Sequence, residues 1–204
     1  MPLYKEWSPD AHSLAAIWKI EEPEAFFAAA TGLTETIKHD KRRIERLAGR
    51  YLLQYLKEDF PLLHIYADAE DKPRIPADQY YFSISHSYPY IAAMVSDIHE
   101  CGIDIQCWHP RMEALQHKFL SREEQLYFRN DTRLITLGWS IKEAAYKWLG
   151  RRGIEFIEQL QILSFDKEGN QYQVLLNAIV PESTRQQSIT GYIEEEFSLA
   201  FTVN

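Results

Sequence analysis

The stretch around which this chain is organised reads Trp139-Ser140-Ile141-Lys142-Glu143-Ala144-Ala145-Tyr146-Lys147. It contains neither Gly nor Pro and is rich in good helix formers, so it predicts a helix. Ile141, Ala145 and Trp148 recur at offsets of four and three residues and would bury one face of that helix. Glu143 and Lys147 are one turn apart on the same side, where they could hold a metal ion and an anion. The alternative is a solvated surface pair that contributes only about 0.3–0.5 kcal/mol.

The size and composition of the chain restrict the classes of protein to which it can belong. With 204 residues it is one large domain or two small ones, and 46% hydrophobic residues are enough for a core. The net charge of −8 argues against a general nucleic-acid binder, although it allows a local basic site for a phosphorylated ligand. No run of about 20 apolar residues predicts a membrane span, and residues 1–6 do not resemble a signal peptide.

The two cysteines, Cys101 and Cys107, flank one apparent strand and lie too far apart on it to form a disulfide. Their spacing also differs from the CxxC pattern of a metal site. Free thiols fit a reducing compartment, so the sequence predicts a cytoplasmic protein.

Residues 38–57 predict a second amphipathic helix, because apolar side chains recur at helical spacing until the chain approaches Pro61. The first half of this basic helix carries Lys38, Lys41, Arg42, Arg43, Arg46 and Arg50. In an acidic protein, such a concentration of positive charge indicates a phosphate group or an acidic partner. A solvated helix face is the alternative.

Two further segments predict strands that carry polar side chains. Residues 80–87 alternate apolar and polar positions and end in Ser85-His86-Ser87, a cluster able to donate hydrogen bonds to an anion. Residues 90–95 would return as the other strand of a hairpin. Residues 101–106 predict a short strand with Asp104 in its interior, a position that disfavours Asp. A divalent cation would explain this acid, and an exposed strand face is the alternative.

The remaining segments favour an α+β fold. Residues 121–124 predict a capping box that begins a helix, and Gly150 and Gly153 end the central helix. From residue 161 onward two hairpins are expected, the first with a turn at residues 166–170. Helices and hairpins follow one another without a regular β-α-β alternation. This order predicts antiparallel sheets and two similar halves that meet near residue 100.

Five stretches, in this order, resemble the motifs of the 4′-phosphopantetheinyl transferase superfamily, specifically its monomeric Sfp-like branch with two halves in tandem. They are Lys72-Pro73, Ser83-Ile84-Ser85-His86-Ser87, Gly102-Ile103-Asp104-Ile105, Phe119-Leu120-Ser121-Arg122-Glu123-Glu124 and residues 139–147. The combination of the third and the fifth stretch, about 35 residues apart, is the most specific part. The resemblance extends from about residue 40 to the C-terminus.

The resemblance implies two pseudo-symmetric α+β halves, each a small antiparallel sheet packed with helices, and an active site in the cleft between them. Residues 1–100 would form the N-terminal half, which binds the nucleotide and phosphates of coenzyme A. Residues 101–204 would form the C-terminal half, with the metal and the catalytic helix. The enzyme would transfer the 4′-phosphopantetheine arm of coenzyme A to a serine of an acyl or peptidyl carrier protein, depend on Mg²⁺ and release adenosine 3′,5′-bisphosphate. It would be a monomer without nucleic-acid or membrane partners, serving fatty acid, polyketide or nonribosomal peptide biosynthesis.

The roles of individual residues also follow from the resemblance, position by position. Asp104 and Glu143 would ligate Mg²⁺ and form the catalytic group together with Lys147, which would contact the phosphate and steady the leaving group. The residues implied in holding the phosphates of coenzyme A are Lys72, Ser85, His86 and Lys147, with an arginine of the basic helix, for which Arg43 and Arg50 compete with Arg42 and Arg46.

Gln106 departs from the pattern, because many relatives have a third acid at this place. Its amide oxygen could ligate Mg²⁺ weakly or through a water molecule. A non-catalytic relative that binds coenzyme A or a carrier protein is therefore the alternative function. Residues 117–129 combine basic and aromatic side chains and are a candidate docking surface for the carrier, unless the aromatic residues form core.

Overall fold

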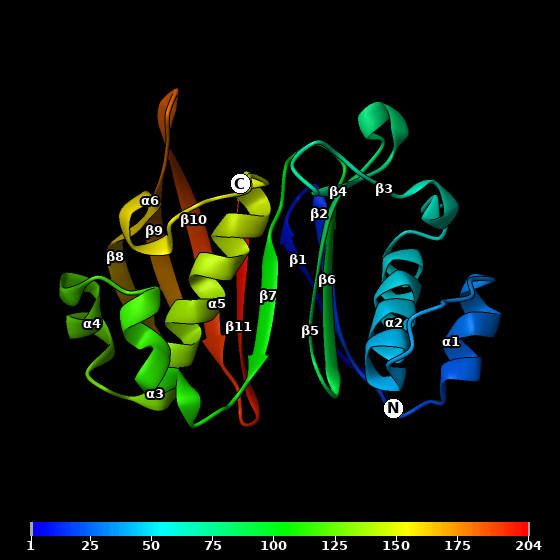
Figure 1. Cartoon of the computed structure of the whole chain (residues 1–204), viewed down its shortest axis with the longest axis horizontal. Coiled ribbons are helices and arrows are strands. Elements are labelled where there is room, and N and C mark those ends of the chain that lie inside the picture. The colour runs from blue at the N-terminus through cyan, green and yellow to red at the C-terminus, as the bar shows by residue number, and fades with distance from the viewer. Residues whose placement is uncertain (1, 204) are drawn as a thin grey trace.

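Two antiparallel sheets lie side by side in the computed structural model, which describes residues 2–203 (Figure 1). The N-terminal sheet has the order β1-β2-β6-β5, and the C-terminal sheet has the order β7-β11-β10-β9-β8. The strands of the first are β1 (Leu3–Asp10), β2 (Ser13–Lys19), β5 (Tyr81–Ser87) and β6 (Tyr90–Ser96). Those of the second are β7 (Ile103–Cys107), β8 (Leu160–Glu168), β9 (Gln171–Val180), β10 (Ser183–Ile193) and β11 (Phe197–Val203). A short pair, β3 (Tyr66–Ala67) and β4 (Pro73–Arg74), lies between β2 and β5 in the chain.

Helices cover the outer faces of the two sheets (Figure 1). On the N-terminal sheet lie α1 (Glu24–Thr31) and α2 (Asp40–Leu56). With the C-terminal sheet pack α3 (Arg111–Leu115), α4 (Arg122–Phe128), α5 (Thr132–Leu149) and α6 (Phe156–Gln159). Single 3₁₀ turns span Leu62–His64, Pro76–Asp78 and Gln116–Lys118. The predicted α+β class with antiparallel sheets is confirmed, and none of the described helices is long and apolar enough to cross a membrane.

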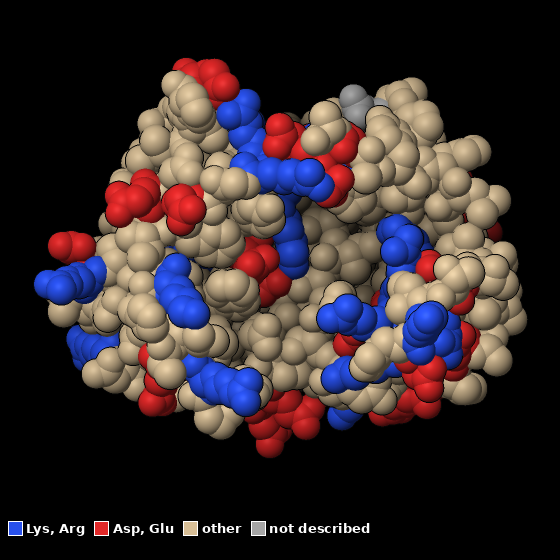
Figure 2. All heavy atoms as spheres, viewed as in Figure 1, with Lys and Arg blue, Asp and Glu red and all other residues tan. Residues whose placement is uncertain are grey.

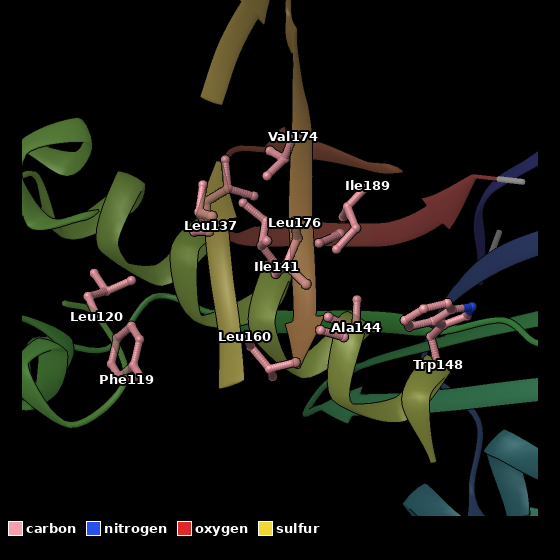
Figure 3. Close-up of a cluster of buried hydrophobic side chains, with 14 of the residues drawn as sticks. Phe119, Leu120, Leu137, Ile141, Ala144, Trp148, Leu160, Val174, Leu176 and Ile189 are labelled. Carbon is pink, nitrogen blue, oxygen red and sulfur yellow. The ribbon is translucent and has the colours of Figure 1, made fainter. Parts of the chain in front are cut away.

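The largest core lies between α5 and the C-terminal sheet. In Figure 3, Leu137, Ile141 and Ala144 of α5 lie beside Val174, Leu176 and Ile189 of the strands. The predicted apolar stripe of Ile141, Ala145 and Trp148 is buried. Packing of this face against the sheet supplies most of the stability of the helix. A second core lies under α1 and α2, and a third joins β2 and β6 to β7 and β11.

The ends of the helices follow the expected local chemistry. Ser121 and Glu124 form both hydrogen bonds of the predicted capping box at the start of α4. Asp131 accepts hydrogen bonds from two backbone amides at the start of α5, and Gly150 ends this helix with a φ of 64°. The prediction for residues 166–170 was too wide: β8 continues to Glu168 and the turn is Gly169-Asn170.

The two sheets meet where β5 and β7, an edge strand of each, run beside each other. Three backbone N–H groups of β7 donate to three serine hydroxyls of β5 instead of to backbone carbonyls. The bonds are Ile103 N to Ser83 Oγ (3.1 Å), Ile105 N to Ser85 Oγ (3.2 Å) and Cys107 N to Ser87 Oγ (2.9 Å). We call this contact the serine seam. It satisfies donors that an edge strand would otherwise leave unpaired in the interior.

A buried ion pair fixes the position of α5. Lys142 is fully buried, and its Nζ donates to Glu124 Oε2 at 2.6 Å and to the carbonyl of Phe156 at 3.0 Å. The other oxygen of Glu124 accepts the backbone N–H of Ile162. Burial lowers the pKa of Lys142, which the charge of Glu124 partly offsets. The pair therefore connects α4, α5, α6 and β8, and it fixes the turn of α5 that also carries Glu143.

Replacing Lys142 by methionine is expected to destabilise the fold by about 3–5 kcal/mol, because Glu124 would remain buried without its cation. The free energy of unfolding measured with urea checks this. The matched control is Lys38→Met at an exposed position, for which a change below about 0.5 kcal/mol is expected. Equal stability of the two variants would contradict the structural role of the buried pair.

Candidate functional site

A cavity of about 360 Å³ is lined by residues from both halves of the molecule. Lys72 and Ile84 of the N-terminal half line it on one side, and Tyr146, Lys147 and Arg151 of the C-terminal half on the other. Figure 2 shows the surface hollowed between the halves, with basic and some acidic side chains around the hollow. The lysines and arginines that line the cavity outnumber its acids, a balance that favours an anionic ligand.

Asp104 of β7 is 5% exposed and points from the strand toward α5. Its Oδ1 accepts two hydrogen bonds, one from Ser85 Oγ at 2.7 Å and one from Lys147 Nζ at 2.7 Å. Its Oδ2 is buried and has no hydrogen-bond partner among the described residues. A buried carboxylate oxygen without a partner costs free energy, so Asp104 is suited to bind a cation that enters together with a ligand.

Two side chains of α5, Lys147 and Glu143, lie near Asp104. Lys147 Nζ donates to the carbonyl of Ile103 at 3.0 Å as well as to Asp104. Glu143, one turn earlier, makes no hydrogen bond or ion pair with the rest of the described chain. Burial, and then the charge of Asp104, raise the pKa of Glu143 to about 7, although Lys147 opposes this shift. The alternative of a solvated Glu143–Lys147 surface pair is wrong, because Lys147 pairs with Asp104 instead.

The close approach of α5 to β7 depends on Gly102. A Cβ atom at this position would lie 2.0 Å from the carbonyl oxygen of Ala144 and 2.8 Å from the backbone nitrogen of Trp148. Only a residue without a side chain fits between the strand and the helix. The glycine therefore allows side chains of α5 to reach Asp104.

The donor set fits a magnesium ion with few protein ligands. Asp104 offers Oδ2, and Glu143 adds a second carboxylate, whose pKa is raised in part by the charge of Asp104. Gln106 follows Asp104 on the same side of β7, and its Nε2 donates to the carbonyl of Cys107 at 3.1 Å. Within residues 2–203 no group of three or more His, Cys, Asp and Glu side chains is arranged for a metal. Mg²⁺ nevertheless binds commonly through one or two carboxylates, with waters and substrate phosphates completing its shell.

A second cavity, of about 480 Å³, lies beside α2 and shares Ile84 with the first. Its lining includes Arg42, Arg46 and Arg50 from the basic helix and His86 from β5. The guanidinium of Arg50 is half-buried and makes no hydrogen bond or ion pair within the part of the chain that the structure describes. Burial, and then the charge of Arg46, lower the pKa of Arg50. An anion in this cavity would relieve both effects.

Arg43 lies outside this cavity. Its guanidinium donates to Glu24 at 2.7 Å, to the carbonyl of Ile37 at 2.8 Å and to Asp40 at 3.0 Å. Because consecutive helix residues point in directions about 100° apart, Arg42 and Arg43 cannot serve the same face. The structure thus favours Arg50, with Arg42 and Arg46, over Arg43 for an anion in the second cavity.

The cluster Ser85-His86-Ser87 does not face one ligand. Successive side chains of a strand point to opposite sides, so Ser85 and Ser87 face β7 while His86 faces α2. His86 is 57% exposed, and its Nδ1 lies 3.3 Å from Oε2 of the buried Glu45. Only His86 of this cluster therefore lines the second cavity.

Lys72 lines the first cavity but is tied to structural partners. Its Nζ donates to Glu100 at 2.5 Å and to the carbonyl of Trp148 at 3.0 Å, and burial lowers its pKa. The bond to Trp148 joins the loop of the N-terminal half to the end of α5. A phosphate contact by Lys72 would have to compete with this arrangement.

The segment 117–129 divides between core and surface. Phe119, Leu120 and Phe128 are buried and pack in the C-terminal core. The prediction that these three residues belong to a docking surface is therefore wrong. Leu126 and Tyr127 are exposed.

Comparison with known proteins agrees with the geometry of the site. The family model of the 4′-phosphopantetheinyl transferase superfamily matches residues 100–202, which include β7 with Asp104 and α5 with Glu143 and Lys147. The 4′-phosphopantetheinyl transferase AcpT of Escherichia coli O157:H7 is 36% identical over 80 residues, which cover 39% of this chain and 40% of that relative. The match thus spans well under half of the relative's length. Because the family model covers half of the chain, including β7 and α5, the chain belongs to the 4′-phosphopantetheinyl transferase superfamily.

Proposed function

We propose that this protein transfers the 4′-phosphopantetheine arm of coenzyme A to a serine hydroxyl of an acyl or peptidyl carrier protein, with Mg²⁺, and releases adenosine 3′,5′-bisphosphate. The observation that carries the proposal is that Asp104 and Glu143 both lie beside Lys147, which lines the first cavity. Residues from a strand and a helix some forty positions apart place an unpartnered carboxylate oxygen and an ammonium within reach of one ligand. Membership of the superfamily supports the reaction class.

Coenzyme A would span both cavities, between halves formed by residues 1–100 and 101–204. Its 3′-phosphate would lie in the second cavity against Arg50, with His86 on the same wall. Its diphosphate would lie in the first cavity near Lys147. Ile84 lines both cavities, which supports the proposal that one extended ligand occupies the two.

The chain's own residues would act mainly by position and charge, as phosphoryl-type transfer requires. Mg²⁺ held by Asp104 and Glu143, with Gln106 adding a weak or water-mediated contact, would neutralise charge on the diphosphate. Lys147 would donate to the same phosphate oxygens and steady the leaving group. Glu143 would accept the proton of the attacking serine through a water molecule rather than directly, because a carboxylate that holds a metal ion is a weak base.

The alternative is a non-catalytic relative that binds coenzyme A or a carrier protein, which Gln106 favours because it replaces a charged ligand by a neutral one. Both proposals place the ligand in the same cavities. They differ in the fate of the acceptor, since only the transferase modifies it. Monomeric state is part of the first proposal, because both halves of the cleft come from one chain.

Mass spectrometry of a panel of carrier proteins incubated with this protein, coenzyme A and Mg²⁺ tests the function. We expect the mass of the phosphopantetheine arm to appear on the carrier and to be absent when the metal is chelated. The Asp104→Ala variant is expected to bind the carrier but leave it unmodified. Binding of coenzyme A by calorimetry without modification of any carrier would favour the non-catalytic alternative.

A further inference from the structure

Ser85 makes contacts that the other two serines of the seam do not make. All three hydroxyls accept a backbone N–H of β7. Ser85 alone also donates its proton to a carboxylate, Oδ1 of Asp104 at 2.7 Å. The contact is buried, since Ser85 and Asp104 are each 5% exposed.

The direction of this hydroxyl is determined by its neighbours. The N–H of Ile105 occupies a lone pair of Ser85 Oγ, and a carboxylate that accepts on Oδ1 stands within hydrogen-bond distance. The chain from Ile105 N–H through Ser85 to Asp104 is therefore polarised in one direction, and bonds in such chains strengthen one another. A hydroxyl held in this way has one orientation rather than three.

The contacts of Oδ1 also fix the position of Oδ2, the other oxygen of Asp104. With Ser85 and Lys147 both on Oδ1, rotation of the carboxylate would break two hydrogen bonds, one of them charge-assisted on both sides. Oδ2 is then held without a partner from the described chain. Lys147 comes from the C-terminal half, whereas Ser85 comes from the N-terminal half, so both walls of the cleft hold the same carboxylate.

We propose that Ser85 is a positioning residue, which fixes the carboxylate of Asp104 so that Oδ2 is presented to the metal ion. The role rests on the proposed function, in which Asp104 is a metal ligand. It differs from the implied role of Ser85 as a direct phosphate ligand, because its proton is committed to Asp104. According to this proposal, a residue of the N-terminal sheet orients the metal ligand Asp104, which belongs to the C-terminal sheet.

Ser83 offers a matched control. It is buried like Ser85 and accepts the N–H of Ile103 in the same way, two residues earlier along both strands. It makes no hydrogen bond with Asp104. Because Ser83 also lines the first cavity, the two variants are compared by their Mg²⁺ dependence and not by their affinity for coenzyme A. Ser83→Ala and Ser85→Ala both remove the acceptor of a β7 N–H across the seam, which should lower the free energy of unfolding by about 1 kcal/mol, and by more in Ser85→Ala because its bond to the carboxylate is also lost. Only Ser85→Ala releases the carboxylate.

Calorimetric titration of coenzyme A at increasing Mg²⁺ concentration separates the two variants. For Ser85→Ala, we expect the Mg²⁺ concentration at half-maximal binding to rise about 10- to 100-fold, as for the loss of other groups that orient a metal ligand. For Ser83→Ala, we expect the Mg²⁺ concentration at half-maximal binding to change by less than about threefold. Ser85→Cys, whose thiol is a weak donor of similar shape, should give an intermediate shift and serves if the alanine variant does not fold.

Crystal structures of metal-free Ser85→Ala and Ser83→Ala provide a second readout that does not depend on activity. We expect the carboxylate of Asp104 to rotate in the first variant and to keep its orientation in the second. Equal Mg²⁺ shifts in both variants, or an unchanged carboxylate in Ser85→Ala, would overturn the proposal. If wild-type binding shows no Mg²⁺ dependence, the metal-dependent function fails, and the crystal structures alone decide whether Ser85 orients Asp104.

Discussion

Replacing Glu143 by glutamine is expected to reduce transfer to the carrier at least ~100-fold, as the loss of an electrostatic group at the reacting centre does. The change keeps the size of the side chain and removes the carboxylate that is proposed to hold the metal beside Asp104. Initial rates of carrier modification at saturating Mg²⁺ measure the effect. Glu168→Gln, at an exposed position in a hairpin, is the control and should keep the wild-type rate.

The same substitution should stabilise the metal-free fold at alkaline pH. The pKa of Glu143 is about 7 in the fold and 4.5 without the fold's influence. An acid with a raised pKa favours folding fully below its unfolded value, and this contribution is lost as pH rises from about 4.5 through 7. At pH 8 the wild type buries a charge that Glu143→Gln lacks, so the variant should need more urea to unfold.

The difference in urea midpoint between wild type and Glu143→Gln should shrink when the pH is lowered to about 5, because Glu143 is then protonated in the fold. A difference that stays constant between pH 5 and 8 would show that Glu143 does not titrate in this range. Near wild-type transfer by the variant would remove Glu143 from the mechanism, whatever its effect on stability.

Replacing Lys147 by alanine is also expected to reduce transfer at least ~100-fold. Its ammonium is the only donor from α5 to Asp104, and it faces the cavity where the diphosphate is proposed to lie. We expect kcat to fall more than the affinity for coenzyme A, because charge on the leaving group develops during transfer. The rate and the KM for coenzyme A are to be measured together.

Lys167→Ala is the control for Lys147→Ala, because Lys167 is exposed in the β8–β9 hairpin. Circular dichroism of both variants checks that the fold is intact, so that a lower rate does not reflect unfolded protein. Transfer at the wild-type rate by Lys147→Ala would exclude Lys147 from catalysis. A rise in KM alone would assign it to binding of coenzyme A.

Local patterns were sufficient to predict most of the elements. The helices α2 and α5 follow from apolar side chains at helical spacing, and the capping box at Ser121 follows from hydrogen bonds within four residues. Strand β1 was not predicted. Its inward positions include Lys5, whose ammonium lies 4.5 Å from the ring centre of Tyr192, so a charged residue interrupts the apolar alternation.

Contacts between distant segments were beyond the reach of these patterns. Lys142 and Glu143 are adjacent charged residues in the sequence, yet Lys142 is paired with Glu124 in the core, whereas Glu143 has Asp104 and Lys147 as its charged neighbours. Ser85 looked like an anion donor because the partner that takes its proton, Asp104, lies on another strand. The register of the basic helix was likewise open until the neighbours of Arg43 and Arg50 were known.

Because Gly102 has no side chain, α5 can lie close to the strand that carries Asp104. Any larger residue there would push Ala144 outward, and the displacement would be shared by Glu143 and Lys147 on either side of it, while Asp104 stayed with its strand. A single methyl group would thus widen the gap between the two carboxylates without touching either of them. The spacing of this centre is governed by bare backbone as much as by the charged groups themselves.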